Sequence, residues 1–209
     1  MTEPAYPAAR AVAETVREHF ARNIAAARRR GERELAPEPD AEAIKLVAEL
    51  TTRLDALALA LTEAQTRPRT LVLEWLEPPF APGHWVPEQV AYAGGDPSFG
   101  NAGGKSRTTT AEEIREYAPE VVVLAPCGFY KEDTISALAR ARLPRGWREL
   151  PAALAGEVWA IDATSYFSRP GPRVVRGAEI LARILHPEIF GPPEADEAVR
   201  VPAELIQAD

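Results

Sequence analysis

The chain is poor in the residues that build disulfides, membrane spans and basic surfaces. It has a single cysteine, Cys127, so no disulfide can form within the chain, and this usage fits a reducing compartment. No stretch approaches the roughly 18 apolar residues of a membrane-spanning helix, which excludes a membrane span. The formal net charge of −7 argues against a general nucleic-acid binder.

The first residues also lack a targeting pattern. No basic segment followed by an apolar core is present, so the N-terminus does not read as a secretory signal. We therefore expect a cytoplasmic protein, or a periplasmic or extracytoplasmic one if the chain is part of a longer polypeptide. Cysteine and histidine form no closely spaced pair, so a structural zinc site is not expected.

Composition divides the chain near residue 66. Residues 1–66 are rich in Ala, Glu and Arg and contain no strand-like run, whereas the prolines concentrate after residue 67. Apolar residues at helical spacing predict an amphipathic helix over 8–30 and a longer one over 41–64. The longer helix ends in a stretch that is apolar all round, Leu57 to Leu61, which predicts burial on more than one side.

Strands and helices alternate over residues 67–190. Apolar runs predict strands at 70–75, 120–125 and 157–162. Strands that alternate with helices pair in parallel, so we predict an α/β fold, a Rossmann-like three-layer lobe with a mostly parallel sheet, preceded by two helices. Residues 191–209 are expected to form a loosely packed C-terminal tail. The predicted helices lie over residues 87–93, from 110 onward, over 131–142 and over 172–186.

Three loops that follow the predicted strands carry aromatic and ionisable side chains. The carboxyl ends of parallel strands meet at one rim of a sheet, where α/β proteins bind their ligands. This combination predicts a flat or bulky ligand, stacked by aromatic rings and oriented by a few polar groups. The loops supply Glu74, Trp75, Phe80, His84 and Trp85, then Cys127, Gly128, Phe129 and Tyr130, then Tyr166, Phe167, Ser168 and Arg169.

Other chemistries stay open for the same residues. Cys127 could be a nucleophile activated by His84, although no third orienting residue is evident. His84 and Glu88 are four residues apart and could share a helical face, with Cys127 completing a metal site. The glycine-rich loop over residues 96–107, with Gly94 and Gly95 before it, does not match a phosphate-binding loop because it follows a helix, so a flexible rim loop is expected.

Four segments in fixed order resemble a known family. They are EWLEPPFAPGHWVPEQVAYAGG, VVVLAPCGF, GWRELPAALAGEVWAID and SYFSRPGPRVVRGAEILARILHPEIF. Together they look like the C-terminal lobe of helical-backbone (class III) substrate-binding proteins of ABC transporters, and the cobalamin-binding type most of all. The resemblance covers about residues 67–190, and helix 41–64 is similar to the interdomain backbone helix. The family's N-terminal lobe has no counterpart, because only about 40 residues precede that helix.

The resemblance implies a non-enzymatic module that binds a corrinoid (cobalamin-like) or related metal chelate, with no covalently bound cofactor. It also implies docking to an ABC transporter permease, for which Glu74 and Glu88 are the candidate carboxylates. By the same analogy, the C-lobe side of the cleft is lined by Trp75, Phe80, His84 and Trp85, its middle by Cys127, Gly128 and Phe129, and its far edge by Tyr166 and Arg169.

Because half of the family's cleft is missing, a second copy or another polypeptide could complete it. A homodimer through residues 8–66 would also cover the apolar face of helix 41–64. Two alternatives remain: a degenerate lobe that acts as a dimerisation or protein-interaction module, and an enzyme that depends on Cys127 and His84.

Overall fold

The computed structural model describes residues 41–143 and 145–207. Its centre is a four-stranded sheet in the order β1-β5-β6-β7. The strands are β1 (Thr70–Leu73), β5 (Val121–Leu124), β6 (Val158–Ile161) and β7 (Ala198–Arg200). β1, β5 and β6 are parallel, and β7 runs antiparallel to β6. The prediction of an α/β fold with a mostly parallel sheet is therefore confirmed.

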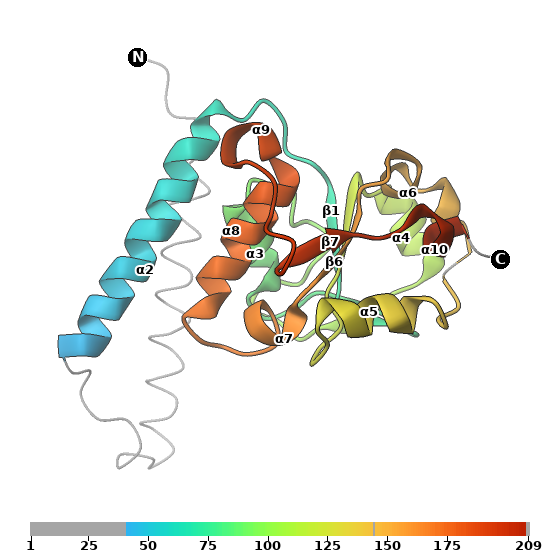
Figure 1. The fold of residues 1–209 in the computed structure, drawn as a ribbon, viewed down its shortest axis with the longest axis horizontal. Coiled ribbons are helices and arrows are strands. Elements are labelled where there is room, and N and C mark those ends of the chain that lie inside the picture. Colours follow the sequence, from blue (N-terminus) through green and yellow to red (C-terminus); the bar gives the residue numbers. More distant parts are fainter. Residues whose placement is uncertain (1–40, 144, 208–209) are drawn as a thin grey trace, which may run out of the picture.

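The parallel strands separate two hydrophobic cores. Every residue in the three strands is buried, and successive side chains point to opposite faces. Val72 and Val123 thus belong to one core, whereas Leu73 and Leu124 belong to the other. Helices cover both faces of the sheet and produce three layers (Figure 1).

On one face, α3 (Val86–Tyr92) and α8 (Arg173–Leu185) cover the sheet, and α2 (Ala41–Ala60) packs outside them. A short turn, η1 (Leu61–Glu63), continues α2. The Arg53 guanidinium donates two 2.7 Å hydrogen bonds to the Glu179 carboxylate, which attaches α2 to α8. The predicted long helix is thus present. The prediction that its last turns are buried on more than one side is wrong for Leu59, which is 72% exposed.

The other face carries shorter helices and turns: α4 (Ala111–Tyr117), α5 (Lys131–Leu138), η2 (Trp147–Glu149), α6 (Pro151–Ala155) and α10 (Ala203–Gln207). The start of α4 has a reciprocal capping box, in which the Thr110 hydroxyl accepts from the Glu113 N–H and the Glu113 carboxylate accepts from the Thr110 N–H. Two more short helices, α7 (Ala163–Tyr166) and α9 (Pro187–Phe190), flank α8.

Two predictions require correction. The strand expected over 70–75 ends at Leu73, and the chain then enters a small antiparallel sheet of β2 (Trp75–Leu76), β3 (Pro79–Ala81) and β4 (Arg107–Thr108). The expected loosely packed tail was also wrong, because β7 pairs with β6 and Ile206 of α10 is buried. The predicted helix over 8–30 lies outside the described residues. In the described part of the chain, no helix combines the length and hydrophobicity that a membrane crossing needs.

Candidate ligand-binding crevice

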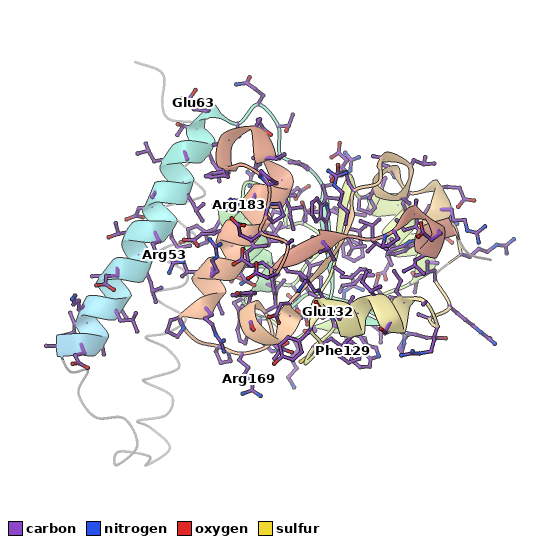
Figure 2. The ribbon with its side chains drawn as sticks, in the orientation of Figure 1. Arg53, Glu63, Phe129, Glu132, Arg169 and Arg183 are labelled. Carbon is purple, nitrogen blue, oxygen red and sulfur yellow. The ribbon has the colours of Figure 1, made fainter. Side chains whose placement is uncertain are left out.

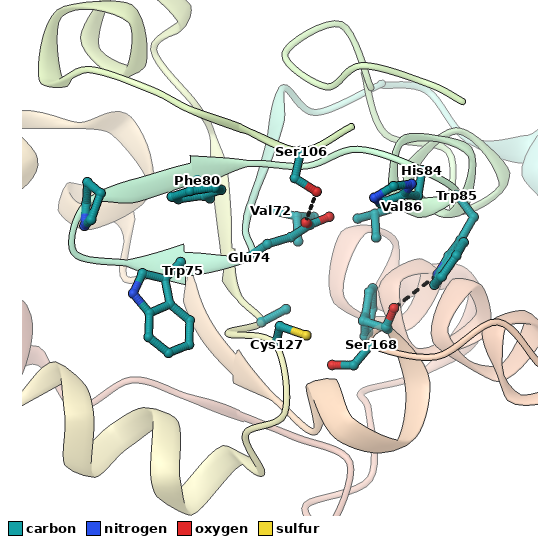
Figure 3. A pocket seen from close by; sticks show the side chains of 13 residues that line it. Val72, Glu74, Trp75, Phe80, His84, Trp85, Val86, Ser106, Cys127 and Ser168 are labelled. Carbon is teal, nitrogen blue, oxygen red and sulfur yellow. Dashed lines mark hydrogen bonds between the residues drawn. The ribbon is translucent and has the colours of Figure 1, made fainter. Parts of the chain in front are cut away.

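A cavity of about 580 Å³ opens at the carboxyl ends of the parallel strands. All three predicted loops reach it, together with a residue of the glycine-rich loop (Figure 3). This is the rim at which α/β sheets bind ligands, because the strand ends there leave a crevice between the outgoing loops. Its lining residues are Val72, Glu74, Trp75, Pro78, Phe80, His84, Trp85, Val86, Ser106, Ala125, Cys127, Phe167 and Ser168.

Aromatic rings form much of the crevice wall. Trp75 and Phe80 face each other across the β2–β3 pair, in which they are register partners. Trp75 is 38% exposed and meets Phe129 edge-on, with ring centroids 5.4 Å apart. Trp85 stands on the opposite side, and its indole N–H donates a 3.0 Å hydrogen bond to the Phe167 carbonyl. The rings therefore keep fixed positions and offer apolar surface to a ligand.

The carboxylate of Glu74 joins two loops at the crevice. Oε1 accepts a 3.1 Å hydrogen bond from the Gly83 N–H, and Oε2 accepts one from the Ser106 hydroxyl. We call these three residues the Glu74 clasp. The backbone of Glu74 is engaged as well, since its N–H donates to the Phe80 carbonyl and its carbonyl accepts from the Cys127 N–H, each at 3.0 Å. Both carboxylate oxygens of Glu74 therefore help to hold the two loops together.

His84 is held in a left-handed backbone conformation, with φ of 53°. Its N–H donates to the Gly104 carbonyl at 2.6 Å, and its carbonyl accepts from the Gly103 N–H at 2.8 Å. The preceding Gly83 has no room for a side chain, because a Cβ there would lie 2.3 Å from the Ser106 nitrogen. The glycine-rich loop thus packs against the first loop and presents the exposed imidazole at the crevice. A backbone strained in this way is a cost that the surrounding hydrogen bonds must offset.

Further hydrogen bonds tie the third loop to its neighbours. The buried Gln89 amide of α3 donates to the carbonyls of Tyr166 and Val174, at 3.0 and 2.8 Å. The Ser168 hydroxyl accepts a 3.0 Å hydrogen bond from the Gly128 N–H, which connects the third loop to the second. All three loops are therefore linked before any ligand arrives.

The residues that the family resemblance assigned divide into two groups. Trp75, Phe80, His84, Trp85 and Cys127 line the crevice, as does Glu74. The remaining five do not. Gly128 and Arg169 are exposed, and Arg169 points away from the fold (Figure 2). Phe129 contacts Trp75 edge-on, Tyr166 packs against the core, and Glu88 is half-buried in the first turn of α3.

The alternative chemistries that the sequence left open concern His84, Glu88 and Cys127. His84 precedes α3 and has a left-handed backbone, so it shares no helical face with Glu88. Over residues 41–143 and 145–207, no cluster of three or more His, Cys, Asp or Glu side chains could hold a metal ion. Within that same part of the chain, no hydrogen bond joins Cys127 to His84.

No protein-family model matches the chain, and no curated protein matches it. Solved structures do match. A TroA-like periplasmic binding protein, FepB, from Veillonella parvula is similar with a TM-score of 0.58 and 16% identity, over 77% of this chain and 56% of that one. A structure of an ABC-type Fe³⁺-hydroxamate transport system from Saccharomonospora viridis is similar with a TM-score of 0.56 and 22% identity. The match covers 68% of this chain and 49% of that one.

A third similar structure is the periplasmic heme-binding protein RhuT from Roseiflexus sp. RS-1, with a TM-score of 0.55 and 19% identity, over 69% of this chain and 55% of that one. The chain has the fold of part of these periplasmic binding proteins. It spans about half the length of each. At such low identity the likeness concerns the fold alone, and it does not distinguish a cobalamin-binding type from the others.

Sequence reasoning missed several residues that shape the crevice. Val72 reaches it from within β1, and Ser106 from a glycine-rich loop that has no periodic pattern. Gln89 offered a usable signal, since it is an amide on the apolar face of a predicted helix, beside Val90. A buried amide in that setting must find hydrogen-bond partners, and here they are the carbonyls of the third loop.

Proposed function

We propose that this chain is a non-enzymatic ligand-binding module, similar to one lobe of a substrate-binding protein, and that its ligand is a metal chelate with a bulky, flat framework. A corrinoid is the first candidate and haem the second. The observation that carries the proposal is the aromatic crevice of about 580 Å³ at the carboxyl ends of β1, β5 and β6. Cavities of roughly 300–1,000 Å³ with apolar walls and few polar groups are the usual sites of small ligands.

The architecture of the crevice supports this function. Trp75, Phe80 and Trp85 offer ring faces, and hydrogen bonds from Trp85 and Gln89 hold the loops in place. A preformed site loses little conformational entropy on binding, so more of the contact energy remains as affinity. The fold likeness agrees with such a role, because the similar structures include a heme-binding protein and an Fe³⁺-hydroxamate transport protein.

The exposed imidazole of His84 suggests how a chelate would be oriented. Imidazole is a good ligand for iron and cobalt, and the left-handed backbone places this ring at the mouth of the crevice. Coordination of the chelate's metal by His84 is part of the proposal. An ABC transporter permease is the proposed partner, with Glu74 and Glu88 as the candidate docking carboxylates.

The test is a visible-absorption titration with aquocobalamin, cobinamide and hemin, on the parent chain and on Trp75→Ala. We expect a saturable spectral shift in the parent and at least tenfold weaker binding in Trp75→Ala, because an aromatic hot spot contributes about 2 kcal/mol or more. Tyr130→Ala is the matched control, since Tyr130 is an exposed aromatic outside the crevice. No shift with any of the three chelates, or equal losses in both variants, would refute the proposal.

A second candidate function is a protein-interaction module. The observation that favours it is the apolar surface of α2, where Ile44 is 60% exposed and Val47 is 61% exposed. Exposed apolar side chains on one helix are typical of interaction surfaces. Sedimentation velocity tests this function, because an interaction surface on α2 predicts that the chain self-associates.

A further inference from the structure

A second hollow, of about 590 Å³, lies away from the crevice, between the end of α5, η2 and α10. Among the described residues that line it are four arginines, Arg140, Arg142, Arg145 and Arg148, and a single carboxylate, Glu149. We call it the arginine hollow. A local excess of positive charge is unexpected here, because the whole chain has a net charge of −7. The excess marks a place where the chain attracts anions.

Most of these guanidinium groups have no acidic partner within the described residues. Arg140, Arg142 and Arg145 are exposed and form no ion pair there. The nearby Arg115 provides a contrast, because its guanidinium contacts the Glu112 carboxylate at 2.7 Å. Glu77, on the β2–β3 turn, is also close, and its carboxylate accepts a 3.3 Å hydrogen bond from the backbone N–H of Arg142. The Arg142 side chain is open to an external anion because it is exposed and forms no ion pair within the described residues.

Besides the arginines, the wall of the arginine hollow contains Trp147, whose indole N–H is a hydrogen-bond donor without a partner among the described residues. Trp147 is 3% exposed, and its indole N–H has no hydrogen-bond acceptor in the described part of the chain. A buried donor without an acceptor is costly and uncommon in folded proteins, so it calls for an explanation. An anion that enters the hollow would supply both the acceptor for this donor and the countercharge for the arginines.

We propose that the arginine hollow binds the phosphate group of a small molecule. Guanidinium groups donate paired hydrogen bonds that match the oxygen spacing of phosphate, which a single ammonium group cannot do. The concave shape and the volume favour a small phosphate-bearing ligand, either free phosphate or a phosphomonoester. This site is separate from the crevice, and the inference does not depend on the function proposed there.

The experiment is isothermal titration calorimetry with inorganic phosphate and with glycerol phosphate, each against sodium chloride at the same ionic strength. The variants are Arg142→Gln and Trp147→Phe. The matched control is Arg173→Gln, which removes an exposed arginine on α8, far from the hollow in the sequence and the fold. We expect saturable heats in the parent and control, and about tenfold weaker binding in Arg142→Gln because one charge-assisted contact is lost.

Trp147→Phe separates a binding role from a structural one. The substitution removes the N–H but keeps an aromatic ring. We expect weaker phosphate binding, while no hydrogen bond within the described residues is lost, because this N–H has no acceptor there. Tighter binding of glycerol phosphate than of phosphate would identify a phosphomonoester as the ligand, and the reverse would identify free phosphate. Equal heats in Arg142→Gln and Arg173→Gln, or heats that chloride reproduces, would overturn the proposal.

Discussion

Glu74 shows how one side chain can shape a ligand site without being its main contact surface. Its two carboxylate oxygens accept hydrogen bonds from Gly83 and Ser106, which lie on different loops. Gly83 is required at its position, because any Cβ would collide with the backbone of the glycine-rich loop. The clasp thereby sets the separation of the loops that present His84 and the crevice wall.

We expect Glu74→Ala to weaken chelate binding and to lower the free energy of unfolding by about 1–3 kcal/mol, since the Gly83 N–H and the Ser106 hydroxyl both lose their acceptor. Urea unfolding and the absorption titration measure the two effects. Ser106→Ala, which removes one of the two hydrogen bonds, should give a smaller effect of the same sign. Glu116→Ala, an exposed carboxylate on α4, is the control. Unchanged binding in Glu74→Ala would show that the clasp does not position the crevice.

Among the helices, α4 begins with the clearest local signal in the chain. The Glu113 carboxylate accepts hydrogen bonds from the Thr109 hydroxyl, the Thr110 N–H and the Arg107 guanidinium. The hydrogen bond from Thr109 is the largest of the causes that lower the pKa of Glu113 to about 2. The charged form of Glu113 is therefore the one that stabilises the start of α4.

This assignment predicts a pH dependence. A lowered pKa contributes stability that is fully present above the unfolded value of 4.5 and is lost as the pH falls through the folded value of about 2. Glu113→Gln should therefore be less stable than the parent at pH 7, and the difference should shrink as the pH falls from 4.5 to 2. Urea unfolding at both ends of this range measures it, with Glu116→Gln as the control. A difference that is constant with pH would contradict the assignment.

At the scale of the whole molecule, the main feature is the exposed apolar surface of α2. Its C-terminal half packs on the lobe through Leu57, but Ile44 and Val47 in its first half are exposed. Figure 1 shows α2 on the outer side of α8, with the two helices diverging toward the start of α2. Apolar side chains on such a helix favour association with another surface, and a second copy of the chain is the simplest one.

We therefore expect the chain to self-associate at micromolar concentration, measured by sedimentation velocity. Val47→Glu should shift the population toward the monomer, because a charge at the contact must be desolvated. Leu154→Glu is the matched control, since Leu154 is also an exposed apolar side chain, at 76% against 61% for Val47, but lies on α6, on the other face of the sheet. A monomer in the parent chain would reject this prediction, and it would also remove the main support for the interaction module.

Local sequence patterns were sufficient to predict most of the helices and strands. The runs at Leu71–Leu73 and Val121–Leu124 form buried parallel strands, and the Thr110–Glu113 spacing gives the capping box that it predicts. The pattern failed at β7, because a three-residue edge strand carries too little periodicity to be recognised. It failed again at Trp75, where the chain leaves the main sheet and pairs with β3.

The candidate residues of the crevice show the same division. The sequence alone identified the three parallel strands and the aromatic loops that follow them, because chain order and hydrophobic pattern indicate where such strands lie. Only the tertiary structure determines which side chains line the cavity and which, like Phe129, contact a lining residue without lining the cavity themselves. The selection rests on hydrogen bonds between distant positions, such as Glu74 to Ser106 and Trp85 to Phe167. No local pattern encodes such contacts, since they form only after the sheet has brought the loops together.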